Sequence, residues 1–368
     1  MAGSVFGKNF TVTTWGESHG KGIGAVVDGC PAGLNINETI IQEFLNRRKP
    51  GQSKYSTPRS EGDIVTILSG VFEGKSAGTP ISMAVMNENQ RSKDYSEIAA
   101  MYRPGHADFT FDSKYGFRDY RGGGRSSGRE TIGRVCAGAI ASSILNELGI
   151  SVKAYTRSIN DIEIDYNKFD EDFIMKSPLY MPDKEASRKA EDFLLSTMEN
   201  KDSAGGIIEC VVTGCPAGIG EPVFDKLDAS LAKAVMSIGA VKGVEIGDGF
   251  EVARLLGSTD NDSFQYDSNG NIIKKTNHSG GILGGMSDSD TIILRAAIKP
   301  TPSIAKSQDT INNKGENITV NIKGRHDPII VPRAVVVVES MVAITLTDLI
   351  FENMHSSMDK IKKLYLNK

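Results

Sequence analysis

The chain has 368 residues, a length that fits one large domain or two domains of average size. Its 42 Lys and Arg against 46 Asp and Glu give a net charge of −4, which argues against a protein whose whole surface attracts nucleic acid or anionic membrane. Hydrophobic residues make up 39% of the chain and charged residues 24%, which excludes global disorder. The 39 glycines follow no collagen-like period and therefore indicate many tight turns.

The predicted elements begin with an amphipathic helix at residues 38–48, which ends at Lys49-Pro50-Gly51. Further helices are predicted at 130–148, which is apolar on nearly all sides, at 184–198, which is charged, and at 334–352. Strands are short and bounded by Gly, and Asn269-Gly270 marks a hairpin over 263–275. Because strands and helices do not alternate regularly, we expect an α+β fold of antiparallel sheet covered by helices.

An internal repeat divides the chain. Residues 25–33 and 210–218 share Gly-Cys-Pro-Ala-Gly, and each copy follows an apolar run and precedes an amphipathic stretch. A second match follows in the same order, at 69–86 and 279–298. We therefore expect a single domain over 1–368, built of two related halves (about 1–150 and 205–352) with an acidic helical insert near 160–204.

The compartment follows from what the sequence lacks. Residues 1–8 have no apolar core for a signal peptide, and the longest apolar stretch, 334–346, contains Glu339 and is too short to span a bilayer. The four cysteines have no CxxC spacing and no His at ligand spacing, which favours reduced, buried thiols over a disulfide framework or a metal site. We expect a cytoplasmic protein without a metal ion.

Two basic or Gly-rich segments lie in the first 60 residues. His19 stands between Ser18 and Gly20, where it is either a substrate-facing imidazole or a solvated turn residue, and the hexapeptide 15–20 does not decide between the two. The basic run around Arg48 and Lys54 favours a capped surface helix end, since cations suit a helix C-terminus, over a loop that closes on an anion.

The densest polar segment is 103–134, with six arginines and the run Gly122-Gly123-Gly124-Arg125-Ser126-Ser127 before an apolar helix. Free backbone N–H groups, hydroxyls and guanidinium groups at a helix start favour an anion site. The run lacks the Gly-Lys-Ser/Thr of a phosphate-binding P-loop and is too solitary for a disordered RGG element. A last segment, 323–328, brings Arg325, His326 and Asp327 together.

These residues favour proton transfer on a small polyanion. The sequence shows no Ser-His-Asp or Cys-His order, no acidic cluster for magnesium and no Cys/His set for zinc. Two alternatives remain: an Arg-rich RNA-binding module, which would show salt-sensitive RNA retention, and a flavin-independent enzyme acting on a phosphorylated sugar acid, such as an isomerase.

Six segments resemble the chorismate synthase family: residues 16–20, 103–108, 119–129, 241–247, 277–281 and 324–328. The resemblance runs from Val5 to about Leu349. It implies a β-α-β sandwich of antiparallel sheets and helices with internal pseudo-symmetry, assembled as a homotetramer. It also implies a lyase that converts 5-enolpyruvylshikimate 3-phosphate to chorismate by 1,4-anti elimination of phosphate, the last step of the shikimate pathway, with reduced FMN and no net redox change.

The resemblance carries residue roles. It implies His19, His106 and Asp327 as catalytic residues. It implies substrate contacts from Ser18, Arg48, Arg103, Ser127 and Arg129. It implies flavin contacts from Arg125, Ser126, Ser127, Gly239, Ala240, Gly284, Lys299, Pro300, Thr301, Pro302, Ser303 and Arg325. Arg48 and Lys54 are the expected NADP contacts, with NADPH as an indirect reductant and a separate flavin reductase as the source of reduced FMN. No nucleic-acid or membrane partner is expected.

Overall fold

In a computed structural model, residues 3–56, 62–87, 99–322 and 327–366 are described. Two five-stranded antiparallel sheets form the outer layers. The first sheet has the order β1 (Val5–Phe6), β2 (Thr11–Gly16), β3 (Gly22–Asp28), β7 (Ile81–Met86) and β4 (Val65–Ile67). The second has the order β11 (Val241–Ile246), β16 (Ile292–Ile298), β10 (Gly206–Thr213), β8 (Ser151–Ile159) and β9 (Ile162–Glu163).

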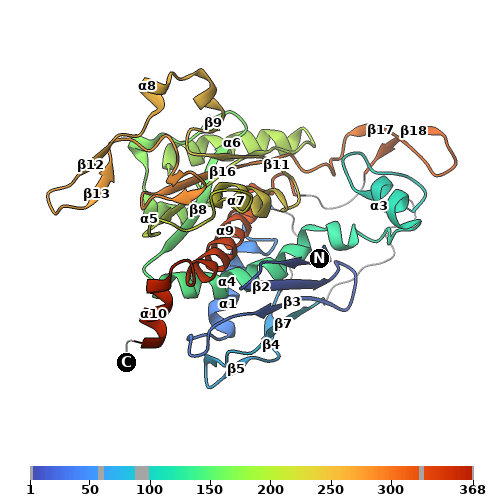
Figure 1. Ribbon diagram of the computed structural model, residues 1–368. Helices are drawn as coiled ribbons and strands as arrows, with labels where there is room; N and C mark the ends of the chain where they lie inside the picture. The colour runs from blue at the N-terminus through green and yellow to red at the C-terminus, as the bar shows by residue number, and fades with distance from the viewer. Residues whose placement is uncertain (1–2, 57–61, 88–98, 323–326, 367–368) are drawn as a thin grey trace.

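Helices lie between the two sheets, as Figure 1 shows. The first sheet packs against α1 (Glu38–Arg48) and α4 (Thr131–Glu147), and the second against α7 (Leu227–Met236) and α9 (Val331–Asn353). Along the middle of the molecule α4 packs on α9. The mixture of helices with antiparallel sheets confirms the predicted α+β class.

The bounds of α1 are those predicted from the sequence, because its signals are local. The Asn37 side chain accepts a hydrogen bond from the Ile40 N–H at 3.1 Å and caps the first turn. Glu38 lies in the first turn and Arg47 and Arg48 in the last, which suits the helix dipole at both ends. Lys49 leaves the helical conformation before Pro50.

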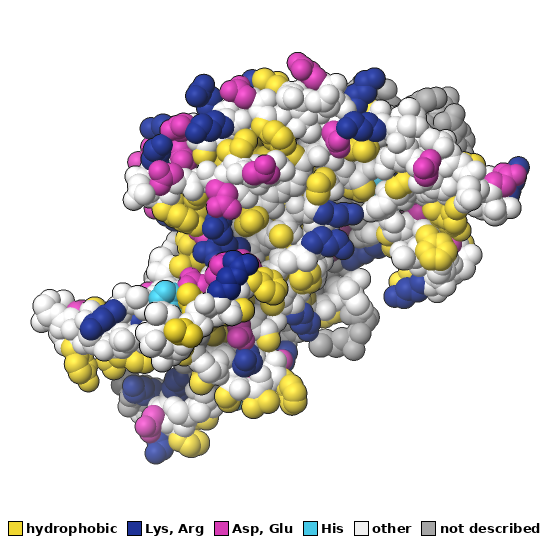
Figure 2. Space-filling model, turned by 90° about the horizontal axis from the view of Figure 1, so that it is seen from above, with side chains coloured by type: hydrophobic (Ala, Val, Ile, Leu, Met, Phe, Trp, Pro, Cys, Tyr) yellow, Lys and Arg dark blue, Asp and Glu magenta, His cyan; other side chains and the backbone are white. Residues whose placement is uncertain are grey.

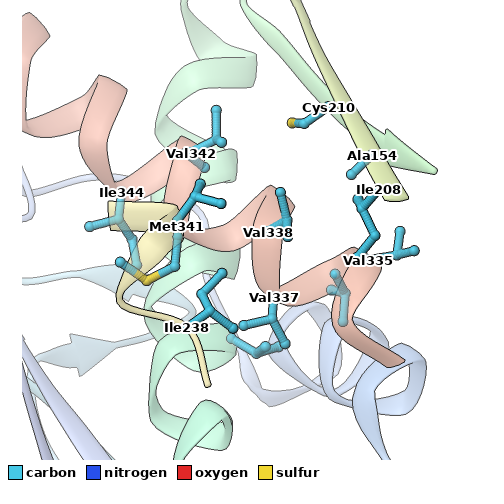
Figure 3. Close-up of a cluster of buried hydrophobic side chains, with 14 of the residues drawn as sticks. Ala154, Ile208, Cys210, Ile238, Val335, Val337, Val338, Met341, Val342 and Ile344 are labelled. Carbon is cyan, nitrogen blue, oxygen red and sulfur yellow. The ribbon is translucent and has the colours of Figure 1, made fainter. Parts of the chain in front are cut away.

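The core is centred on α9 (Figure 3), whose valines and isoleucines pack against Ala154, Ile208 and Cys210 of the second sheet. At 23 residues α9 is long enough to cross a bilayer, so the expectation that this stretch is too short was wrong. Of its most apolar window, 83% is buried inside the protein, and the helix is therefore a core helix. One of its two buried carboxylates, Glu339, receives two hydrogen bonds from Arg47, at 2.6 and 2.9 Å.

The two sheets share an order of strands. The run β2-β3-β7-β4 in the first corresponds to β8-β10-β16-β11 in the second, although β8 precedes the predicted boundary at residue 205. The turns after β3 and β10 are held in the same way. Ser76 Oγ donates to the Pro31 carbonyl at 2.5 Å, and Ser287 Oγ donates to the Pro216 carbonyl at 2.6 Å.

Smaller elements surround this body. The segment between β9 and β10 of the second sheet holds α5 (Glu171–Ile174) and the amphipathic α6 (Lys184–Glu199). The predicted hairpin is present as β12 (Phe264–Tyr266) and β13 (Ile272–Lys274), which project from one end of the molecule. The remaining elements are β5 (Val71–Phe72), β6 (Lys75–Ser76), α3 (Asp108–Tyr115), α8 (Gly257–Asp260), β14 (Ile282–Leu283), β15 (Met286–Ser287), β17 (Ser307–Ile311), β18 (Asn317–Asn321) and α10 (Met358–Leu366). On the face in Figure 2, basic and acidic side chains are interspersed rather than gathered into one basic patch.

Candidate active site

The turn that follows β2 carries Ser18 and His19. Both are buried, with 4% and 8% of their surfaces exposed, so His19 is not a solvated turn residue. Ser18 Oγ lies 3.1 Å from His19 Nδ1. The turn closes through a hydrogen bond from the Gly20 N–H to the Glu17 carbonyl at 3.1 Å, and it aims both side chains into the protein.

Asn87, the residue after β7, is bonded to this same turn. Its side-chain Nδ2 donates to the carbonyls of Glu17 at 3.1 Å and Gly20 at 2.9 Å. Its Oδ1 accepts a hydrogen bond from Arg129 Nη2 at 2.7 Å. The turn and Arg129 are therefore neighbours, although more than 100 residues separate them in the chain.

Two buried arginines face one carboxylate. Asp63 Oδ1 lies 3.1 Å from Arg129 Nη1, and its Oδ2 lies 3.4 Å from Arg48 Nη2. Burial lowers the pKa of Arg48 to about 10, although the charge of Asp63 opposes that shift. Among the described residues, Arg48 Nε has no hydrogen-bond partner. A buried pair of guanidinium groups with such a donor suits a small anion.

The glycine run ahead of α4 takes the conformation that only glycine adopts readily. Gly122, Gly123 and Gly124 have φ values of +84°, +109° and +53°. Ser127 then accepts a hydrogen bond from the Arg129 N–H at 3.3 Å and so caps the turn that leads into α4. The run therefore brings the Ser127 hydroxyl and the Arg129 guanidinium to the same place.

Asp327 lies beside these arginines. Its Oδ2 accepts a hydrogen bond from Arg333 Nη1 at 2.5 Å, and Arg333 Nε donates to the Arg48 carbonyl at 3.1 Å. Arg333 lies in the first turn of α9, which packs against α1, so the C-terminal segment reaches the buried Arg48 of the first half. The predicted flavin contact Arg325 lies outside the described residues.

His106 belongs to a second group of polar residues. Its Nδ1 lies 2.9 Å from the Pro104 carbonyl and its Nε2 lies 2.9 Å from Ser303 Oγ, so the Nδ1 hydrogen is donated and Nε2 accepts from the hydroxyl. Burial, and then the positive charge of Arg103, lowers the pKa of His106. The ring is thereby held as a neutral imidazole.

Arg103, a predicted substrate contact, is held by a neighbouring carboxylate. Its guanidinium makes two hydrogen bonds of 2.8 Å to Asp108, at the start of α3. Burial alone would raise the pKa of Asp108, but the hydrogen bonds from Arg103 lower it. This pair fixes the loop that carries His106, and the structure gives Arg103 no contact with Arg48 or Arg129 among its described hydrogen bonds and ion pairs.

The segment 299–303 packs against the His106 loop. Lys299 Nζ donates to the Gly105 carbonyl at 3.0 Å, and the Lys299 N–H donates to the Ala240 carbonyl at 2.9 Å, which places Gly239 and Ala240 at the same corner. Among the described residues the buried Thr301 hydroxyl has no hydrogen-bond partner. An ammonium group, an unpartnered hydroxyl and an imidazole fit a flavin and its phosphate.

Four predicted residues do not join these groups, and one of them is Ser126, whose hydroxyl donates to the Gly123 carbonyl at 2.7 Å. Gly284 lies in the β14–β15 hairpin, which contacts the N-terminal end of α7, whereas Gly239 follows the other end of this helix, about 15 Å away by its length. Lys54 is exposed over the Tyr55 ring, while Arg48 is fully buried. The Arg125 guanidinium donates to the Gly16 carbonyl at 3.0 Å and so binds the end of β2.

The predicted residues that the structure brings together are Ser18, His19, Arg48, Ser127, Arg129 and Asp327 in one group and His106, Gly239, Ala240, Lys299, Pro300, Thr301, Pro302 and Ser303 in another. Sequence reasoning missed three charged or polar partners, Asp63, Asn87 and Arg333. The only local signal was the position of Asn87 directly after an apolar strand.

Comparisons with known proteins agree with one another. A family model described as chorismate synthase matches residues 10–351. The chain is 70% identical over 365 residues to a chorismate synthase of Lachnoclostridium phytofermentans, covering 99% of this chain and 100% of that one. It is 54% identical over 351 residues to a chorismate synthase of Methanosarcina mazei, with coverages of 95% and 96%. A solved structure titled "Crystal Structure of Chorismate Synthase" superposes with a TM-score of 0.75 at 30% identity, covering 98% of both chains.

Proposed function

The chain belongs to the chorismate synthase family, and on that premise we propose which residues carry the family's reaction. The enzyme is a lyase that removes phosphate from 5-enolpyruvylshikimate 3-phosphate to give chorismate, the last step of the shikimate pathway. The observation that supports the assignment best is the pairing of two buried arginines, Arg48 and Arg129, with the buried His19 turn.

Binding is the task of the arginine group. The substrate carries a phosphate and two carboxylates, so it needs several fixed positive charges in a place shielded from water. Arg48 and Arg129 supply these charges, and the Ser18 and Ser127 hydroxyls complete the anion contacts as donors. Asp63 offsets part of the repulsion between the two arginines.

Proton transfer is the task of His19 and Asp327. His19 protonates the departing phosphate, because imidazole and phosphate titrate in the same pH range. Asp327 accepts the proton that leaves the ring. The hydrogen bond from Arg333 fixes the orientation of its carboxylate, which a proton acceptor requires.

The flavin site is proposed around His106. Thr301, Ser303, Lys299, Gly239, Ala240 and the backbone of 125–127 would hold the isoalloxazine and its phosphate, with Pro300 and Pro302 shaping the segment. When bound, reduced FMN would supply transient electron density to the elimination, which is needed because the ring hydrogen that is lost is not acidic. Hydrogen bonds at both ring nitrogens, to Pro104 and to Ser303, fix the orientation of the His106 imidazole at this site.

Several finer assignments complete the proposal. We propose that the two halves arose by duplication, because the equivalent serines at the ends of β6 and β15 hold equivalent turns. The assembly is a homotetramer in the cytoplasm, and a separate reductase supplies reduced FMN. NADPH is an indirect reductant, and the placement of the buried Arg48 and the exposed Lys54 gives no support to a joint NADPH contact.

Phosphate release under anaerobic conditions tests the proposal. With a small amount of reduced FMN the enzyme should release many equivalents of phosphate per flavin, and the flavin should still be reduced at the end. His19→Ala and His106→Ala should each lose about 10²–10⁴-fold in turnover. Asp327→Asn should bind substrate but release phosphate slowly. His355→Ala is the control, because His355 is exposed between α9 and α10. Stoichiometric oxidation of flavin, or full activity without flavin, would defeat the proposal.

A further inference from the structure

Asn87 directly follows β7 at one end of the first sheet. Strands β3 and β7 are antiparallel, with Gly22 opposite Met86, so residue 87 lies opposite the end of the turn that precedes β3. The Asn87 N–H donates to the Lys21 carbonyl at 3.0 Å and extends the ladder by one step. Its backbone is therefore part of the sheet, and its side chain starts from a rigid position.

The side-chain amide uses its donor and its acceptor at once. Its Nδ2 donates to two carbonyls of the His19 turn, those of Glu17 and Gly20, while its Oδ1 accepts from Arg129. Rotating the amide by half a turn would face oxygen against carbonyls and nitrogen against a guanidinium, so the orientation is determined. Only an amide side chain both donates twice and accepts in this way.

Arg129 is held on its other side as well. Asp63 lies 3.1 Å from its Nη1, and its own N–H is bound by Ser127 Oγ. Asp63 has a φ of +46°, a conformation that is costly for a residue with a side chain, and it is 4% exposed. The surroundings therefore hold Asp63 in an unfavourable conformation beside the guanidinium.

We propose that Asn87 is a positioning residue that fixes the His19 turn relative to Arg129. The inference rests on the function proposed above, in which Arg129 binds the anion and His19 protonates the leaving phosphate. Both must meet the same substrate in one geometry, and a displacement of about 1 Å can cost on the order of 100-fold in rate. Asn87 touches neither proton nor phosphate and acts through the two residues that do.

Two variants separate its bonds. Asn87→Asp keeps an acceptor for Arg129 but removes both donors and sets a negative charge against two carbonyls. Asn87→Ala removes all three bonds. We expect each to lower kcat about 10- to 100-fold while KM for the substrate changes less than about fivefold. Asn167→Asp is the matched control: it removes a donor from an exposed turn, where Asn167 Nδ2 donates to Asp165 at 3.0 Å, and should leave kcat unchanged.

A double-mutant cycle shows whether Asn87 acts through His19. In the His19→Ala background, Asn87→Ala should cost less than about threefold, because the group that it positions is already gone. The inference would be overturned if Asn87→Ala lowered kcat by the same factor with and without His19, or if both Asn87 variants kept the kcat of the unmodified enzyme. Failure of both variants to fold would also overturn it, since Asn87 would then belong to the fold rather than to the site. If His19→Ala itself keeps full turnover, the proposed function fails instead.

Discussion

Gly122 lies against the imidazole of His19. A Cβ at this glycine would stand 2.2 Å from His19 Cε1 and 2.6 Å from His19 Nδ1, well inside any real contact distance. Gly122 also has a φ of +84°. Glycine at this position therefore allows the positive φ and also leaves room for the imidazole. The glycine run before α4 and the turn after β2 consequently pack against each other.

A methyl group at Gly122 should displace His19. We expect Gly122→Ala to lower turnover by about 100-fold, because the imidazole must move by an ångström or more and loses its approach to the substrate. Initial rates of phosphate release measure this directly.

Gly123→Ala is the control for that variant. Gly123 also has a positive φ, +109°, but a Cβ there would meet nothing closer than Ser126 Oγ at 3.7 Å. Both alanines accept a similar backbone penalty of about 1–2 kcal/mol, so the difference in their rates reports on His19 alone. An equal loss of turnover in both variants would remove the imidazole from the explanation.

The depressed pKa of His106 predicts a pH dependence of stability. Above the ordinary value of 6.5 His106 is neutral in both states and the folded protein keeps its full stability. As the pH falls below 6.5, the unfolded chain takes up a proton that the buried folded ring resists, so stability falls until the folded pKa is reached. His106→Gln should flatten this slope in thermal unfolding between pH 6.5 and 5.

For His278 the predicted pH dependence of stability has the opposite sign, so this residue serves as the comparison. Its hydrogen bond to Asp248, 2.6 Å from Nδ1, raises its pKa. The stability that this bond contributes is full below pH 6.5 and is lost as the pH rises through the raised pKa. His278→Gln should therefore change the stability curve on the alkaline side of pH 6.5. Identical curves for both variants would contradict the assignment of the two environments.

Arg48 should matter for the fold as well as for binding. It is 1% exposed, and Arg48→Ala removes one of two positive partners of the buried Asp63. We expect the free energy of unfolding to fall by about 3 kcal/mol, the low end for a broken buried pair, because Arg129 still faces Asp63. Urea denaturation measures it, and Lys54→Ala, on the exposed turn, should leave the midpoint unchanged. A stable Arg48→Ala protein with a raised KM would mean that Arg48 serves binding only.

Local signals explain how much of the fold could be predicted from the sequence. The cap at Asn37 and the stop at Pro50 determine α1 without help from the rest of the chain. The last long helix was predicted to begin at 334, yet α9 begins at Val331, because Pro332 suits the first turn of a helix and does not end it. The short α3 carries a weak amphipathic pattern and α10 a clear one, and neither was predicted.

In the candidate site, too, the residues in local motifs could be predicted and those that depend on tertiary packing could not. Motif residues such as His19, His106 and Arg129 stand in Gly-rich segments that can be recognised one at a time. Asn87 and Asp63 acquire their roles only when β3 and β7 pair and α1 packs beside α4, because their partners lie 42 and 66 residues further along the chain. Arg103 is the converse case. Its partner Asp108 stands only five residues away, but Arg103 was considered as a substrate contact and this ion pair was not predicted.

The place of α9 has a consequence for the order of events during synthesis. The helix fills the space between both sheets, and the N–H groups of residues 8–10 bind Asp348 near its end at 2.6 to 3.0 Å. The inner face of the first sheet is covered by α1 and α4, but a nascent chain that has not yet reached Val331 cannot cover the inner face of the second sheet, where α9 packs against β8 and β10. Although the second sheet is complete by residue 298, these strands must wait for a helix made several seconds later at about 5–20 residues per second. The second half of the protein therefore completes its core only when the ribosome has almost finished the chain.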